Sequence, residues 1–159
     1  MQNNTESQKN TELKENMLRL RQEYAAAYAR SVRNTRSWII MRLFCAAAAL
    51  VMVAAGIFKT TVVGSTVLGL LVALGISYML RRGVRVLAWL GVAGGAASLA
   101  LFLLNIGAYI QMAGSHPLLY LYILAALLDG GVQCAANGLL LADGEYRAFS
   151  QAVNDQTRV

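Results

Sequence analysis

The sequence predicts an all-α integral membrane protein, an antiparallel bundle of four transmembrane helices with an N-terminal cytoplasmic amphipathic helix. Three observations predict this fold class. Apolar residues make up 57% of the 159-residue chain and charged residues only 14%, against roughly 25% charged residues in an average soluble domain. Of the 22 charged side chains, 11 precede Trp38, so the rest of the chain contains long uncharged runs. Such runs are typical of segments in hydrocarbon.

Four apolar runs are each close to the roughly 20 residues that a helix needs to cross ~30 Å of hydrocarbon. None of them alternates between polar and apolar residues with period two, as strands of a membrane barrel do. We predict one transmembrane domain over residues 37–142, with spans at about 37–58, 60–80, 86–110 and 118–142. Because the connecting loops are short, helices that follow one another in the chain are expected to be antiparallel neighbours.

Arginine residues predict the direction of the spans. They flank the start of the first span and fill the loop at 81–85, whereas only Lys59 and His116 lie at the opposite ends. Since positive residues are enriched in cytoplasmic loops, we expect both termini in the cytoplasm and the protein in the plasma (cell inner) membrane. Arg42 lies one turn inside the first span, and its long side chain is expected to reach back to the headgroups.

The two ends of the chain are polar. Residues 1–10 are predicted to be disordered, and residues 11–36 to form a cytoplasmic amphipathic juxtamembrane helix. Its apolar stripe, at helical spacing, begins with Leu13, Met17, Leu20 and Tyr24. This stripe is expected to lie on anionic headgroups or, alternatively, to dock a partner helix. The cytoplasmic tail, 143–159, has the spacing of a short surface helix at Tyr146, Phe149 and Val153.

One carboxylate lies near the middle of the fourth span. Asp129 is twelve residues from Pro117 and thirteen from Ala142, and a charge at that depth costs roughly 2.5–3.5 kcal/mol, which favours a functional position facing protein. Polar residues of the fourth and third spans are expected to line a track with it: Gln133, Asn137, Ser98 and Asn105. Gly130 and Gly131 are expected to let another backbone or an unwound turn come close.

Three roles fit Asp129. It binds a proton or small cation in a transporter, with the neighbouring polar side chains as neutral ligands. Alternatively, it forms a hydrogen bond with Ser98 or Asn105 and joins two helices within the chain. In the third role it pairs with a basic residue of a partner subunit.

Small residues predict where helices approach closely in lipid. The third span has a G-x-x-x-G pair at Gly91 and Gly95, and the fourth has Gly131 and Ala135 at the same spacing. We expect these four residues to lie at helix contacts, either within one chain or between copies.

No motif of an enzyme occurs in the sequence, since it has no phosphate-binding glycine loop, H-E-x-x-H, paired cysteines or nucleophile elbow. Cys45 and Cys134 are expected to be small packing residues, and His116, the single histidine, a turn residue before Pro117. We therefore expect no enzymatic activity, no metal and no cofactor. The net charge of +6 follows from the arginines that set the orientation, so nucleic acid is not an expected partner.

Two functions remain. The first is a small transport-related membrane protein, an oligomeric carrier or channel or a subunit of a larger transporter, with Asp129 at its centre. The alternative is a non-transporting accessory or assembly protein that docks a membrane partner. Both predict the lipid bilayer as one partner and a second copy or another membrane protein as the other.

Overall fold

The chain folds into α-helices. The computed structural model describes residues 2–157, with side chains described for residues 11, 12 and 14–156, and this part of the chain contains seven helices and no strand. The helices are α1 (Gln2–Glu23), α2 (Ala25–Ala54), α3 (Thr61–Arg81), α4 (Val86–Leu104), α5 (Ile106–Ser115), α6 (Leu119–Ala142) and α7 (Gly144–Thr157). Helices α2, α3, α4 and α6 are long and apolar enough to cross a membrane. The prediction of a helical chain with four apolar spans is confirmed.

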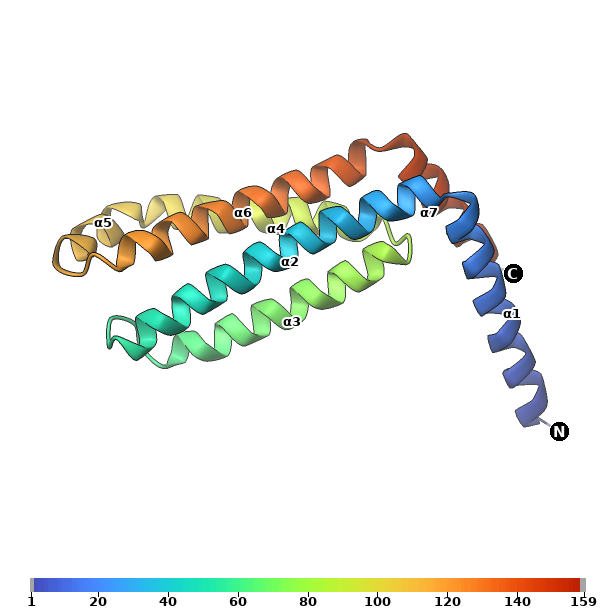
Figure 1. Cartoon of the computed structure of the whole chain (residues 1–159), viewed down its shortest axis with the longest axis horizontal. Helices are drawn as coiled ribbons and strands as arrows, with labels where there is room; N and C mark the ends of the chain where they lie inside the picture. The colour runs from blue at the N-terminus through green and yellow to red at the C-terminus, as the bar shows by residue number, and fades with distance from the viewer. Residues whose placement is uncertain (1, 158–159) are drawn as a thin grey trace.

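Helices α2 and α6 lie side by side, and each packs against one further long helix (Figure 1). Helix α6 packs along α4 and α2 packs along α3, whereas α3 and α4 contact each other only slightly. The expectation that all consecutive spans pack as neighbours is therefore wrong for α3 and α4. The reason is that their close approaches are made elsewhere: Gly69 of α3 faces α2, and Gly91 and Gly95 of α4 face α6.

Glycines bring α4 and α6 together. A Cβ atom added at Gly91 would overlap the side chain of Asn137, and one added at Gly95 would lie 2.8 Å from Cys134 Sγ. Gln133 Nε2 also donates a hydrogen bond to the Gly91 carbonyl oxygen at 3.0 Å. Both glycines of the G-x-x-x-G pair thus lie in the α4–α6 seam, which a larger residue would force apart.

The second small pair, Gly131 and Ala135, lies on another face of α6. A Cβ at Gly131 would meet no described atom within 4 Å, and Ala135 is exposed. Helix α6 instead turns Gly130 toward α4, where an added Cβ would lie 2.6 Å from Leu99 Cγ. Because one residue along a helix rotates the side-chain direction by about 100°, only one of the two adjacent glycines faces α4. The close contact at Gly130 is with the Leu99 side chain and not with another backbone, and α6 continues through both glycines without an unwound turn.

The C-terminal tail forms α7, and its apolar face is buried inside the chain. Helices α1 and α7 lie at the same end of the long helices, the end that carries the arginine-rich loop (Figure 1). Tyr146, Phe149 and Val153 are all buried. The Tyr146 hydroxyl donates a hydrogen bond to the Leu80 carbonyl oxygen at 2.7 Å, and burial raises the pKa of that phenol. Gly83, with φ 85°, leaves the space that the Phe149 ring occupies.

The apolar stripe of the N-terminal arm packs against α7. Leu20 is buried, and Met17 and Tyr24 are partly buried in the cluster that contains Phe149 and Val153. The rings of Tyr24 and Phe149 are 6.1 Å apart. Much of the stripe that was expected to meet lipid headgroups or a partner is thus covered by the chain's own C-terminal helix.

The boundaries of the arm differ from those expected. The helix break falls at Tyr24, between α1 and α2, so that residues 25–36 form the first turns of the same helix as the first span. Helix α1 begins at Gln2. The side chains of residues 1–10 and of Leu13 lie outside the described part of the chain, so the predicted disorder of 1–10 and the position of Leu13 in the stripe stay predictions.

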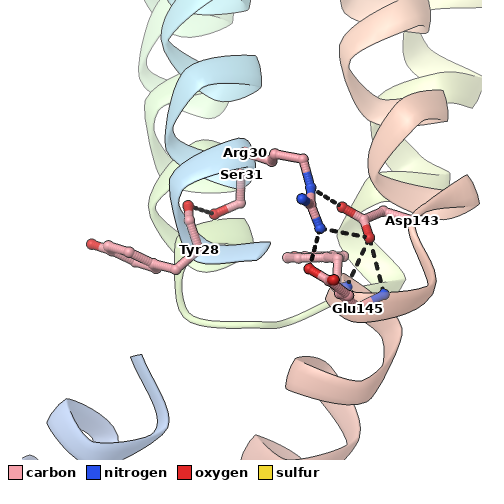
Figure 2. A network of polar contacts seen from close by, with 6 residues as sticks. Tyr28, Arg30, Ser31, Asp143 and Glu145 are labelled. Carbon is pink, nitrogen blue, oxygen red and sulfur yellow. Dashed lines mark hydrogen bonds and ion pairs between the residues drawn. The ribbon is translucent and has the colours of Figure 1, made fainter. Parts of the chain in front are cut away.

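A charged network joins α2 to the start of α7 (Figure 2). Arg30 Nε donates to Asp143 Oδ2 at 2.6 Å, and Arg30 Nη2 donates to Glu145. Asp143 Oδ1 also accepts hydrogen bonds from the backbone N–H groups of Glu145 and Tyr146 at 3.0 and 3.2 Å, and so caps α7. The Arg30 guanidinium, assisted by these N–H groups, holds the pKa of Asp143 below its ordinary value.

Replacing a glycine in the α4–α6 seam will destabilise the protein, whereas replacing the outward glycine will not. Gly91→Ala forces Asn137, which is buried and hydrogen-bonded to Gln133, out of its position, at about 1–3 kcal/mol of overpacking. Gly131→Ala adds a methyl group in open space and is expected to stabilise α6 by up to about 1 kcal/mol. Thermal unfolding of the two variants in the same detergent measures the difference. Equal melting temperatures would contradict the assignment of the seam.

Replacing Asp143 will give a pH-dependent loss of stability. Because its folded-state pKa lies below the unfolded value of about 3.9, the charge stabilises the fold fully above that value, and this contribution is lost as the pH falls through the folded pKa. Asp143→Asn keeps the cap but removes the charge, so its melting temperature should lie below that of the wild type at pH 7 and converge with it in acid. Asp143→Ala loses the cap as well, at a further ~1 kcal/mol. A gap between wild type and Asp143→Asn that is the same at pH 7 and at a pH well below the folded-state pKa would exclude the ion pair as its cause.

Candidate functional site

The carboxylate of Asp129 is paired within the chain. Arg42 Nη1, from α2, donates a hydrogen bond to Asp129 Oδ2, on α6, at 2.6 Å. The side chain of Asp129 is 3% exposed, whereas that of Arg42 is 28% exposed. The carboxylate is therefore enclosed, and Arg42 is the more exposed member of the pair. We refer to these two residues as the polar centre.

The side chain of Arg42 points away from the arginine-rich end. Arg42 lies seven residues beyond Thr35, about 10 Å along α2 at 1.5 Å per residue, and Thr35 accepts a hydrogen bond from Arg81 Nε at 2.9 Å. Its guanidinium contacts Gly69, which lies twelve residues before Arg81 on α3, about 18 Å along that helix. The expectation that Arg42 reaches back to the headgroups is therefore wrong. Its guanidinium extends inward because Asp129, the one carboxylate in the four long helices, lies there.

Ser98 and Asn105 lie beside the polar centre. A cavity of about 280 Å³, which we call the α4 recess, is lined by both residues together with Arg42, Asp129 and Tyr122. Within the described chain, neither residue donates a hydrogen bond to Asp129, whose Oδ1 is buried without a partner. The recess thus brings together three of the predicted site residues without the direct Asp129 contacts that the helix-joining role required.

Asn105 also ends α4. Its Nδ2 donates a hydrogen bond to the Leu101 carbonyl oxygen at 2.7 Å, and the residue lies between α4 and α5 with φ −103° and ψ 2°. A side-chain amide that bonds the backbone of its own helix competes with helical hydrogen bonding. The third long helix is therefore Val86–Leu104 rather than 86–110, and α5 begins at Ile106.

A second cavity, of about 260 Å³, shares Arg42 and part of its lining with the first. This α3 recess is lined by Arg42, Cys45 and Tyr122, which also line the α4 recess, and by Ser65 and Thr66 of α3. Arg42 is therefore accessible from two sides, between α2 and α3 and between α2 and α4.

Gln133 and Asn137 do not line either recess. Gln133 Nε2 donates to the Gly91 carbonyl oxygen across the α4–α6 seam, and Asn137 Nδ2 donates to the Gln133 carbonyl oxygen at 2.8 Å. Both side chains are buried. The polar stripe predicted for the fourth span thus divides, with Asp129 in the polar centre and the two amides in a helix contact.

Sequence reasoning did not assign Arg42 to the site, although a signal was present. Arg42 and Asp129 are a cation and a carboxylate inside otherwise apolar helices, and charged groups in such surroundings pair with one another. Cys45 and Tyr122 were missed for a different reason. Their residue types are common in apolar spans, and only the packing of α2 against α6 brings them to the guanidinium.

Apolar clusters close off the polar centre along the helices. Trp38 and Ala136 belong to the cluster on the arginine-rich side, and Met52, Phe102 and Ile123 to the cluster on the other. In such surroundings an ion pair is stronger than in water. No match to this chain is found among models of protein families, among curated proteins or among solved structures.

Removing one member of the polar centre will destabilise the protein more than removing both. Arg42→Gln leaves the enclosed Asp129 carboxylate without its partner, at about 3–5 kcal/mol, and Asp129→Asn leaves the partly exposed Arg42 guanidinium unpaired, at a smaller loss. The double variant leaves two neutral amides that are able to bond one another, so its loss should be well below the sum of the single losses. Thermal unfolding of the four proteins in one detergent measures this coupling. Additive losses would contradict the ion pair.

Proposed function

We propose that this chain is a small transport-related membrane protein in which Arg42 and Asp129 form the ligand-binding centre. The supporting observation is an enclosed ion pair of 2.6 Å between apolar helices, with its guanidinium open to two recesses. Ionisable residues inside membrane helices are rare and mark the paths of ions and substrates. A pair that served packing alone would not need an accessible cation.

The ligand class that fits is a small anion with a carboxylate or phosphate group. The guanidinium is the exposed member, and it presents several N–H donors in a plane that matches such groups. A small cation, which with a proton was one of the ligands considered from the sequence, would approach Arg42 and would have to replace it at Asp129. An anion would instead compete with Asp129 for Arg42, and the enclosed carboxylate would favour its release.

The arrangement proposed for the spans is an antiparallel bundle with both termini in the cytoplasm of a cell with a plasma membrane. Two ion pairs support opposite directions for α2 and α6, because Arg30 pairs with Asp143 and Arg42 pairs with Asp129. From the first pair to the second, the residue number therefore increases along α2 and decreases along α6. The arginine-rich loop lies at the same end as α1 and α7, which supports that end as the cytoplasmic one.

A second candidate is an accessory protein that docks a membrane partner. Ser65 of α3, Ser98 of α4 and Asn105, directly after α4, are exposed, and α3 and α4 contact each other only slightly. Polar groups in lipid gain hydrogen bonds from a neighbouring helix. A second copy or another membrane protein would supply such a helix on this side of the chain.

Uptake by proteoliposomes tests the transport proposal. The purified chain is reconstituted, and the uptake of labelled acetate, succinate, glutamate and phosphate is compared with that of empty liposomes. We expect uptake of at least one of these anions. The Arg42→Gln/Asp129→Asn variant should lose about tenfold or more of it, because a hydrogen bond to a charged group contributes about 1.5–3 kcal/mol.

The matched control removes a cation and a carboxylate outside the site. Arg36→Gln/Asp155→Asn changes two exposed side chains and should leave uptake unchanged. If the wild type takes up none of the four anions, or if the polar-centre variant takes them up at the wild-type rate, the transport proposal fails. Recovery of the same membrane partner with both variants would then favour the accessory function.

A further inference from the structure

We propose that a basic groove between α1, the α3–α4 loop and α7 binds an anionic phospholipid. The groove has a volume of about 490 Å³ and contains Lys14 and Arg21 of α1, Arg82 and Val84 of the loop, and Val153 of α7. It lies apart from the polar centre, with which it shares no lining residue. The proposal does not depend on transport.

The charges of the groove call for an anion. Lys14, Arg21 and Arg82 line it, and among the residues with described side chains none of the three forms an ion pair, since the pairs present involve Arg30 and Arg42. The guanidinium of Arg21 lies 5.0 Å from the centre of the Tyr28 ring, and that of Arg82 lies 4.5 Å from the centre of the Tyr78 ring. These contacts hold the two cations in place without neutralising them.

The groove also has apolar lining residues, which indicate that the ligand carries an apolar chain. Met17, Leu18, Met79 and Val84 line it beside the cations, and Leu18 is 57% exposed. An inorganic anion would leave these side chains uncovered. An amphiphile covers them with its acyl chain while its phosphate meets the cations.

The position of the groove selects a membrane lipid as that amphiphile. Arg82 follows the last residue of α3, one of the four helices long and apolar enough to cross a membrane. Lipid headgroups lie at the level where such helices end, and basic pockets between helices on that side recognise anionic headgroups. A phospholipid in the bilayer would present its headgroup to the cations of the groove and its acyl chain to the apolar side chains.

Thermal unfolding of the full chain in a neutral detergent tests the proposal with three added probes. These are dioctanoyl phosphatidylglycerol, phosphatidylcholine with the same chains, and inorganic phosphate. Only phosphatidylglycerol should raise the melting temperature, by preferential binding to the folded state. The Lys14→Gln/Arg21→Gln/Arg82→Gln variant should bind it about a hundredfold more weakly.

The matched control has the same net charge. Arg19→Gln/Arg33→Gln/Arg36→Gln removes three exposed arginines that do not line the groove, and it should respond to phosphatidylglycerol like the wild type. An equal loss in both triple variants would overturn the groove in favour of diffuse attraction to the basic surface. An equal response to inorganic phosphate would show that no lipid chain is required. An equal response to phosphatidylcholine would show that no anionic headgroup is required. Either result would overturn the proposal.

A single substitution keeps the test decisive if the groove variant does not fold. Arg82→Gln changes one exposed loop residue and should weaken the binding of phosphatidylglycerol about fivefold. Arg36→Gln should leave it unchanged. Melting temperatures without lipid show whether each variant is folded. Equal affinities of these two single variants would contradict the proposal.

Discussion

The contact between Arg42 and Asp129 constrains the rest of the structure, because neither charge has another partner of opposite sign within the four long helices. It fixes which faces of α2 and α6 meet. The guanidinium then occupies the space beside Gly69, and so determines where α3 lies against α2. Helix α4 packs against another face of α6, where the glycines of α4 leave space for the Gln133 side chain. The arrangement of the four long helices follows from one enclosed pair and one seam of small residues.

The sequence predicted the helices better than their contacts. Runs of apolar residues predicted the bounds of α3 and α6 closely, whereas α2 begins at Ala25, before its apolar run, and α4 ends at Leu104, inside its run. Small residues mark close approach, but Gly130 and Gly131 are adjacent, and only the packed helices decide which one faces α4. Spacing also predicted helix α7 from Tyr146, Phe149 and Val153. It could not predict that these side chains pack on α1 and the α3–α4 loop, which are far away in the sequence.

The polar residues of the spans have two separate tasks. Gln133 donates a hydrogen bond to a carbonyl oxygen of α4 and so joins α6 to α4, whereas Asn137 donates to the Gln133 carbonyl oxygen within α6. Ser98 and Asn105 lie in the α4 recess beside the ion pair, but neither forms a hydrogen bond with Asp129 in the described chain. From the sequence alone the four side chains form one stripe of similar chemistry. The two pairs of side chains differ in their surroundings. Gln133 and Asn137 are buried where α4 and α6 pack closely, whereas Ser98 and Asn105 line an open recess beside Arg42.

The separation of the two charges along the chain, 87 residues, has a consequence for biogenesis. Translation runs from the N-terminus, so the ribosome delivers Arg42 long before it delivers Asp129. During that interval the first apolar helix carries an arginine whose counter-charge has not yet been made. The last long helix to be made therefore supplies the counter-charge of the first.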